Sequence, residues 1–150
     1  MPVGTEDATM NDLWISPDGT KLYMTGTTND RVYYYTFGTA WSLGTLTYVN
    51  SFLVSSEELD PTALYVKPDG TKFWIVGTIN DTIYEYTMGT PWDITTSVYS
   101  GNSLLVSSVD ATVNGIRFHP DGTKFYLLGT TADILTEYSC TAWTIVGAVA

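Results

Sequence analysis

The sequence predicts an all-β fold made of three consecutive four-stranded β-propeller blades. The first observation is a repeat, because Pro-Asp-Gly-Thr-Lys occurs at 17–21, 68–72 and 120–124. The second is composition, because 11 Tyr and 5 Trp accompany only 6 Lys and Arg in 150 residues, a balance that favours strands. A period of about 50 residues with several short strands in each unit is typical of propeller blades, whereas helical repeats need apolar residues spaced at about 3.6.

The first two strands of each unit flank the Pro-Asp-Gly turn. In the second unit, a short apolar run over 63–67 precedes the turn and another over 72–77 follows it. An Asp-Gly pair favours a hairpin, because glycine adopts the positive φ that the turn demands and aspartate bonds neighbouring amides. We therefore expect a structural role for the turn residues Asp18, Gly19, Asp69, Gly70, Asp121 and Gly122.

The second strand of each unit is expected to be buried on both faces of its sheet. Residues 73–76 are apolar at successive positions, as are 22–24 and 125–128 in the other units. An open meander would leave alternate residues in water. The run therefore indicates a strand in a sheet that is covered on both faces by adjacent blades.

The third and fourth strands follow from a second turn and a loop. A turn at Asn80-Asp81 leads into a strand over 82–86, and a loop containing Trp92 leads to a strand around 98–106. Trp41 and Trp143 align with Trp92, and we expect all three to fill the gap where this loop folds over the blade, with ligand stacking as the alternative. The repeats then cover about 4–54, 55–106 and 107–150.

The two ends of the chain align with parts of the same element. Ala150 corresponds to Tyr48, so the third unit stops early in its fourth strand, and residues 1–3 match the finish of a fourth strand at 52–54. Three blades expose two apolar faces, and head-to-tail contacts between identical chains can close a ring. We expect Gly147–Ala150 of one subunit to share a blade with the first residues of the next, so the residues predicted to close the ring are Met1, Pro2, Val3, Val146, Ala148 and Val149.

Ring closure sets the expected number of chains. Two copies would form a homodimer with six blades, which lies within the usual range of four to eight. A homotrimer with nine blades is the alternative.

The repeated turn and the apolar strand after it resemble the propeller repeats of YVTN-like families and of phage and bacterial surface proteins. The resemblance covers nearly the whole chain and implies the propeller fold, with recognition or display at a cell or virion surface. It brings no catalytic residues with it. The Gly-His and Trp-Asp dipeptides of WD repeats are absent at the corresponding places.

Charge and cysteine content exclude several classes of function. A formal net charge of −10 argues against binding of nucleic acid or an anionic membrane, since both attract clustered Lys and Arg. No run approaches the length of about 18 apolar residues that a membrane helix requires. Cys140 is the only cysteine, which leaves no intrachain disulfide. Residues 1–7 lack the basic and apolar start of a secretory signal, and the sequence does not identify a cellular compartment.

The reactive residue types are sparse, and we expect no catalytic site, metal site or cofactor. His119 is the only histidine and precedes Pro120, where the other units have Ser16 and Lys67, so we interpret it as a variable turn residue. Cys140 aligns with Phe37 and Met88 and is interpreted as a packing residue.

One set of carboxylates is a candidate ligand site. Asp7, Glu58 and Asp110 each lie ten residues before a Pro-Asp-Gly turn, on the connection into the first strand. In a six-bladed ring they would gather at the channel mouth, where they could bind a cation or a hydroxyl-rich glycan. The competing interpretation is that they are solvated loop residues.

The sequence therefore favours a non-catalytic module that assembles into a closed ring. The first alternative is a module that binds a glycan or protein on the ring face. The second is a truncated or engineered fragment of a larger propeller.

Overall fold

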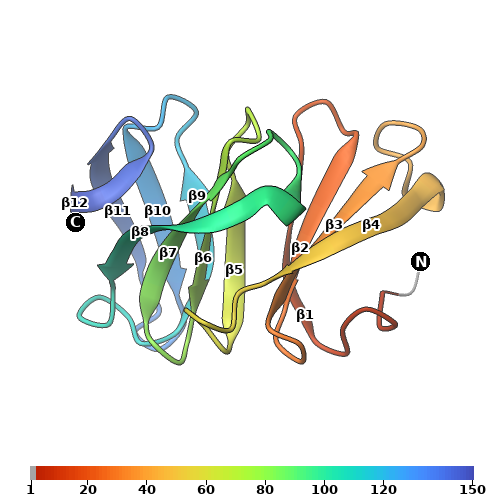
Figure 1. Ribbon diagram of the computed structural model, residues 1–150. Coiled ribbons are helices and arrows are strands. Elements are labelled where there is room, and N and C mark those ends of the chain that lie inside the picture. Colours follow the sequence, from red (N-terminus) through yellow and green to blue (C-terminus); the bar gives the residue numbers. More distant parts are fainter. Residues whose placement is uncertain (1–2) are drawn as a thin grey trace.

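The computed structural model describes residues 3–150, and within them the chain folds into three four-stranded antiparallel sheets in chain order (Figure 1). Blade 1 contains β1 (Met10–Ile15), β2 (Lys21–Gly26), β3 (Arg31–Phe37) and β4 (Leu46–Leu53). Blade 2 contains β5 (Pro61–Val66), β6 (Lys72–Gly77), β7 (Thr82–Met88) and β8 (Ser97–Leu105). Blade 3 contains β9 (Val113–Phe118), β10 (Lys124–Gly129), β11 (Leu135–Thr141) and β12 (Thr144–Val149).

The strands of each blade pair in sequence order, from β1 to β4, β5 to β8 and β9 to β12, which confirms the predicted all-β class. The predicted run over 72–77 matches the bounds of β6, and the third strand of blade 2 continues two residues past its predicted end, to Met88. Two short 3-10 helices, η1 (Leu43–Thr45) and η2 (Ile94–Thr96), precede the fourth strands of blades 1 and 2. No helix in residues 3–150 is long and apolar enough to span a membrane.

The blades contact one another mainly through their first strands. The Leu64 amide donates to Asp12 Oδ2 of blade 1 at 3.0 Å, and Thr62 Oγ1 of blade 2 donates to the Val113 carbonyl of blade 3 at 2.5 Å. These bonds join β1 to β5 and β5 to β9. The first strands therefore converge along one side of the row of blades, as the inner strands of a propeller do.

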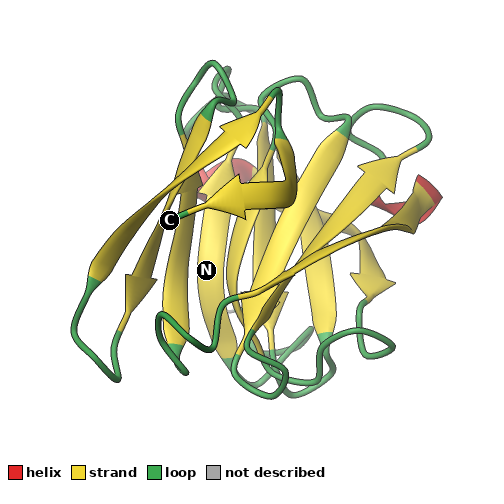
Figure 2. Cartoon of the chain, turned by 90° about the vertical axis from the view of Figure 1, so that its left-hand side faces the viewer, coloured by secondary structure: helices red, strands yellow, loops and turns green. Residues whose placement is uncertain are grey.

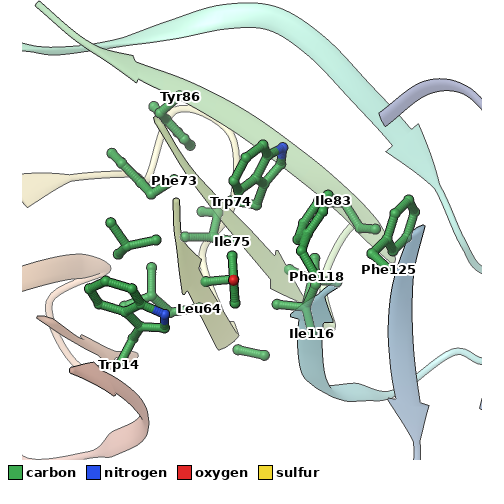
Figure 3. Packing of buried hydrophobic residues seen from close by; sticks show 14 of the residues in the cluster. Trp14, Leu64, Phe73, Trp74, Ile75, Ile83, Tyr86, Ile116, Phe118 and Phe125 are labelled. Carbon is green, nitrogen blue, oxygen red and sulfur yellow. The ribbon is translucent and has the colours of Figure 1, made fainter. Parts of the chain in front are cut away.

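The core runs through the spaces between the blades. Phe73, Trp74, Ile75 and Val76 of β6 are all fully buried, which confirms that this strand is covered on both faces. Figure 3 shows Trp14 of blade 1 on one side of blade 2, with Ile116 and Phe118 of blade 3 on the other. Successive apolar residues are required here because each side of the sheet packs against a different neighbour.

Candidate functional site

The three carboxylates proposed as a ligand site are buried. Asp7 is 2% exposed, Glu58 0% and Asp110 4%. Asp7 lies on the connection into β1 and accepts hydrogen bonds from the amides of Thr9 (2.9 Å), Thr28 (3.2 Å) and Asn29 (3.1 Å) and from Tyr33 Oη (3.0 Å). It thus ties the connection before β1 to the turn between β2 and β3.

The same arrangement occurs in the other two blades. Glu58 accepts bonds from the amides of Asp60 (3.0 Å), Ile79 (3.3 Å) and Asn80 (3.4 Å). Asp110 accepts bonds from the amides of Thr112 (2.7 Å), Thr131 (3.3 Å) and Ala132 (2.8 Å). Neither expectation from the sequence describes these surroundings, because the side chains are not solvated and their oxygens bind backbone amides. A cation or glycan could reach them only after these bonds had broken.

A glycine in each blade makes room for this carboxylate. A Cβ atom at Gly26, Gly77 or Gly129 would collide with the carboxyl groups of Asp7, Glu58 and Asp110 respectively. Each of these glycines precedes a threonine in its repeat. The close approach of a buried side chain explains why the position is a glycine in all three blades.

Hydrogen bonding keeps two of these groups ionised. Burial would raise the pKa of Asp7, but the amides of Thr9 and Asn29 outweigh it, and the pKa lies below the ordinary value. The amide of Ala132 is the main cause of the lowered pKa of Asp110. Asp7 and Asp110 are therefore internal anions whose partners are mainly the chain's own amides.

The aspartates of the Asp-Gly turns bond residues of their own turns. The Asp18, Asp69 and Asp121 carboxylates accept the amide of the threonine two residues on, at 3.0, 3.0 and 2.9 Å. Hydrogen bonds from the Ser16 hydroxyl and from the amide and hydroxyl of Thr20 lower the pKa of Asp18 to about 2. Gly19, Gly70 and Gly122 have φ values of 69°, 73° and 72°, in the left-handed region that favours glycine.

The tryptophans cover these turns rather than a ligand. The indoles of Trp41, Trp92 and Trp143 lie where a Cβ on Gly19, Gly70 or Gly122 would be, so the turn must carry glycine for a second reason. Each tryptophan amide also donates to the carbonyl of its glycine at 2.9 Å. The expected gap-filling role is therefore what the structure shows.

The two outer faces of the row differ from the spaces between the blades. We call the side of blade 1 that faces away from blade 2 the rear face, and the side of blade 3 that faces away from blade 2 the front face. Leu13 on the rear face is 49% exposed, although its equivalents Leu64 and Ile116 are fully buried. Leu128 and Leu135 on the front face are 51% and 72% exposed.

Blade 2 shows what these front-face positions do when a neighbour covers them. Val76 and Ile83, the equivalents of Leu128 and Leu135, are both 0% exposed beneath blade 3. In Figure 1 the N-terminal segment and β12 lie at opposite ends of the row, and Figure 2 views the chain from the blade 3 end. Both outer faces thus carry exposed apolar residues whose equivalents inside the chain are buried between blades.

The outer edge of blade 3 is also only partly paired. In blade 1 the β3–β4 pairing runs from Arg31 opposite Leu53 to Phe37 opposite Leu46. In blade 3 the β11–β12 pairing includes only Ser139 opposite Val149 and Thr141 opposite Thr144. Among the described residues, 135–137 of β11 therefore have no partner on this edge. Within β12, Val146 and Val149 are exposed and Ala148 is partly buried against the core.

Val3 occupies the position that ends a fourth strand. Its carbonyl accepts the amides of Glu6 (3.2 Å) and Asp7 (3.4 Å), just as the Val54 carbonyl accepts those of Glu57 and Glu58 (both 3.0 Å). Met1 and Pro2, also predicted to take part in closure, lie outside the described residues.

His119 and Cys140 each contact a residue of the third Asp-Gly turn. His119 Nδ1 lies 2.7 Å from Asp121 Oδ1 with both side chains about half exposed. Burial raises the pKa of the Cys140 thiol, and its Sγ donates to the Gly122 carbonyl at 3.3 Å. Within residues 3–150, no group of three or more His, Cys, Asp or Glu side chains is arranged to hold a metal ion.

A groove of about 530 Å³ lies between blades 1 and 2. Its lining includes Tyr34, Asn50, Trp92 and Asp93. The Trp92 ring is already occupied there, because it stacks on Trp14 at 6.0 Å between centroids and Lys21 Nζ lies 5.1 Å from its centre.

No protein-family model and no curated protein matches this sequence. Solved structures do resemble the fold. A protein from Lactobacillus plantarum has a TM-score of 0.67 at 21% identity, with 94% of this chain and 40% of that chain covered. A putative 6-phosphogluconolactonase from Bacteroides fragilis has a TM-score of 0.65 at 11% identity, covering 93% and 38%.

The Cps50 (Swd1) β-propeller domain from Myceliophteria thermophila has a TM-score of 0.63 at 13% identity, with 88% of this chain and 40% of that chain covered. The chain thus spans about two fifths of the length of these proteins. At these identities the similarity establishes the fold alone, and the fold is that of a set of β-propeller blades.

Proposed function

We propose that this chain is a non-catalytic propeller module that completes its ring by associating head to tail with a second copy of itself. The observation that carries the proposal is the exposure of Leu13, Leu128 and Leu135, whose equivalents inside the chain are buried between blades. Propellers close with about four to eight blades, so three blades require more, and two chains would supply six.

The edge of blade 3 supports the same pairing of faces. Inside the chain, the Val54 amide donates to the Asp30 carbonyl at 2.9 Å and the Val106 amide donates to the Asp81 carbonyl at 2.8 Å. Val3 is the equivalent of Val54 and Val106, and Asp133 is the equivalent of Asp30 and Asp81. In the proposed ring, the Val3 amide of one copy binds the Asp133 carbonyl of the other.

The surroundings of His119 and Cys140 support a non-catalytic role. His119 is paired with an exposed aspartate in a turn, and the raised pKa of Cys140 disfavours the nucleophilic thiolate. One structural neighbour is a putative 6-phosphogluconolactonase, but at 11% identity only its fold is comparable. The resemblance to surface-protein repeats supports display as the purpose of the ring.

The mass of the native particle tests the proposal. Sedimentation velocity and native mass spectrometry should give twice the chain mass of 16.5 kDa at micromolar concentration. A particle of three chains would replace the six-bladed ring by one of nine blades. A compact monomer at micromolar concentration would overturn the proposal and would indicate a segment of a larger propeller instead.

A second candidate function is binding of a glycan or peptide in the groove beside Trp92. Tyr34, Asn50 and Asp93 supply both an aromatic surface and polar groups there, as saccharide sites do. A glycan array would test this, with Asn50→Ala as the variant and Asn114→Ala, on the exposed surface of blade 3, as the control. Equal glycan binding by the two variants, or none by the unmodified chain, would exclude the groove.

A further inference from the structure

The three aligned tryptophans differ in exposure, and the difference identifies a docking residue. Trp41 is 61% exposed, whereas Trp92 and Trp143 are partly buried. The two covered rings are covered by the preceding blade. Trp14 and Lys21 of blade 1 lie against Trp92, and Tyr65 of blade 2 stacks on Trp143 with centroids 6.2 Å apart. Trp41 has no preceding blade in this chain.

The contact between blades 1 and 2 has a second component. Tyr23 Oη donates to the Trp92 carbonyl at 2.7 Å, with Tyr23 0% exposed and Trp92 partly buried. A tyrosine on the second strand of one blade thus holds the tryptophan loop of the next blade in place. A hydrogen bond buried in this way also fixes the orientation of the two blades.

Blade 3 presents the same two residue types on its front face. Lys124 and Tyr126 stand at the positions of Lys21 and Tyr23, whereas blade 2 has Lys72 and Trp74 there. Tyr126 is partly exposed, and no other blade of the described chain covers it. Lys124 Nζ bonds Glu137 Oε1 at 2.6 Å, and hydrogen bonding to the same carboxylate raises the pKa of Tyr126, so the Tyr126 hydroxyl has to turn away from Glu137 to donate to an incoming carbonyl.

Blade 2 also shows how the equivalent lysine–glutamate ion pair is placed when the next blade covers it. Lys72 Nζ lies 2.9 Å from Glu85 Oε1, and the Glu85 side chain is only 1% exposed beneath blade 3. The equivalent Lys124–Glu137 pair is 43% and 46% exposed. The front face of blade 3 therefore carries a polar set that the fold elsewhere buries against the next blade.

We propose that Trp41 of one copy docks on Tyr126 of the other, with the Tyr126 hydroxyl donating to the Trp41 carbonyl as Tyr23 does to Trp92. The Lys124–Glu137 pair is buried in the same contact. This inference rests on the proposed head-to-tail ring, and it assigns the residues that set the orientation of the two chains.

Two tyrosine variants test the inference. Tyr126→Phe removes one hydroxyl at the outer face, and we expect it to weaken association by about tenfold, the size expected for one net hydrogen bond. Tyr23→Phe is the matched control, because the same hydroxyl is lost inside the chain. It should lower the melting temperature while leaving the dissociation constant from sedimentation equilibrium unchanged.

Fluorescence gives an independent measurement. The difference spectrum between the unmodified chain and Trp41→Phe should shift to shorter wavelength as the concentration passes through the dissociation constant, because Trp41 leaves water. The inference would be overturned, and the proposed ring left intact, by a stable dimer with two properties. Its dissociation constant would be unchanged by Tyr126→Phe, and its Trp41 emission would not shift with concentration. A monomeric unmodified chain would overturn both.

Discussion

Asp7, Glu58 and Asp110 show how a loop residue becomes part of the core in each blade. A carboxylate with 0–4% exposure is unfavourable unless donors surround it, and here each carboxylate binds three amides of its own and a neighbouring connection. Glutamate serves in blade 2 where aspartate serves in blades 1 and 3. The charge and its acceptor oxygens are therefore what the position requires, rather than one side-chain length.

Truncation of the buried glutamate should be costly. We expect Glu58→Ala to lower the free energy of unfolding by about 3 kcal/mol, because three partly buried amides lose their acceptor and the removed side chain leaves a cavity. Glu6→Ala is the control, since the Glu6 carboxylate accepts an exposed bond from Thr5, and it should cost about 0.5 kcal/mol or less. Urea unfolding measures both. Equal costs for the two variants would contradict the anchoring role.

The glycine under each tryptophan can be tested with a control from the same chain. Gly70 (φ 73°) and Gly101 (φ 85°) share a left-handed backbone, but only Gly70 lies beneath an indole. Gly101→Ala should cost about 1 kcal/mol from backbone strain alone. Gly70→Ala should cost about 2 kcal/mol more, because the new Cβ displaces Trp92.

The pair Gly70→Ala and Trp92→Leu completes this test as a double-mutant cycle in urea unfolding. A smaller side chain at 92 should recover most of the additional cost of Gly70→Ala. Costs that simply add would show that the indole is not what excludes a side chain at position 70.

The Asp-Gly turns, as elements, are each held within one blade by a carboxylate whose pKa is depressed. The pKa of Asp121 is lowered to about 2, first by the hydroxyl and amide of Thr123 and then by His119. The pKa of Asp18 is lowered to about 2 by Ser16 and Thr20. Each of these turns is therefore held by an exposed ionised group on one side and by the tryptophan that covers its glycine on the other.

These shifts predict loss of stability in acid. The unfolded pKa of aspartate is about 3.9, and a group whose folded pKa is lower stabilises the fold above that value. The contribution is lost as the pH falls from about 4 through about 2. The melting temperature followed by circular dichroism should fall over this range, and less steeply in Asp18→Asn with Asp121→Asn. Identical slopes for the two proteins would remove these turns from the explanation.

The strands were easier to predict than the connections. The run Phe73 to Val76 predicts a strand buried on both faces, because four successive apolar residues leave neither face polar. The same prediction for 125–128 is wrong at Leu128, which is 51% exposed because no other blade of the described chain covers it. The burial of Glu58 could not be predicted, since a carboxylate enters the core only where amides from a distant turn converge on it. The sequence did contain one signal for this burial. In all three repeats a carboxylate lies ten residues before the turn and a glycine follows the turn.

At the scale of the whole molecule, the chain contains two interfaces that serve as templates for a third. Blades 1 and 2 meet through Tyr23 and Trp92, and blades 2 and 3 meet through Trp74 and Phe118, whose rings are 4.4 Å apart. The front face of blade 3 repeats the residue types of the first interface. Geometry that already joins neighbouring blades within the chain can therefore join the blades of separate chains, with no change of fold.

A charge placed on the front face should prevent assembly without unfolding the chain. Leu135→Asp introduces a carboxylate at a position that is 72% exposed in the free chain and whose equivalent Ile83 is 0% exposed between blades. Burial of an unpaired charge costs several kcal/mol, so we expect association to weaken by at least about a hundredfold.

Val98→Asp is the matched control for this change. Val98 lies on β8 of the middle blade and is 60% exposed even though both faces of that blade are covered, so it faces solvent in the ring as well. Sedimentation velocity at micromolar concentration should show a monomer for Leu135→Asp and a dimer for Val98→Asp, with similar melting temperatures once the effect of concentration is removed. If both variants assembled like the unmodified chain, the front face would not be the surface that joins the copies, because no dimer that buries Leu135 tolerates the new carboxylate.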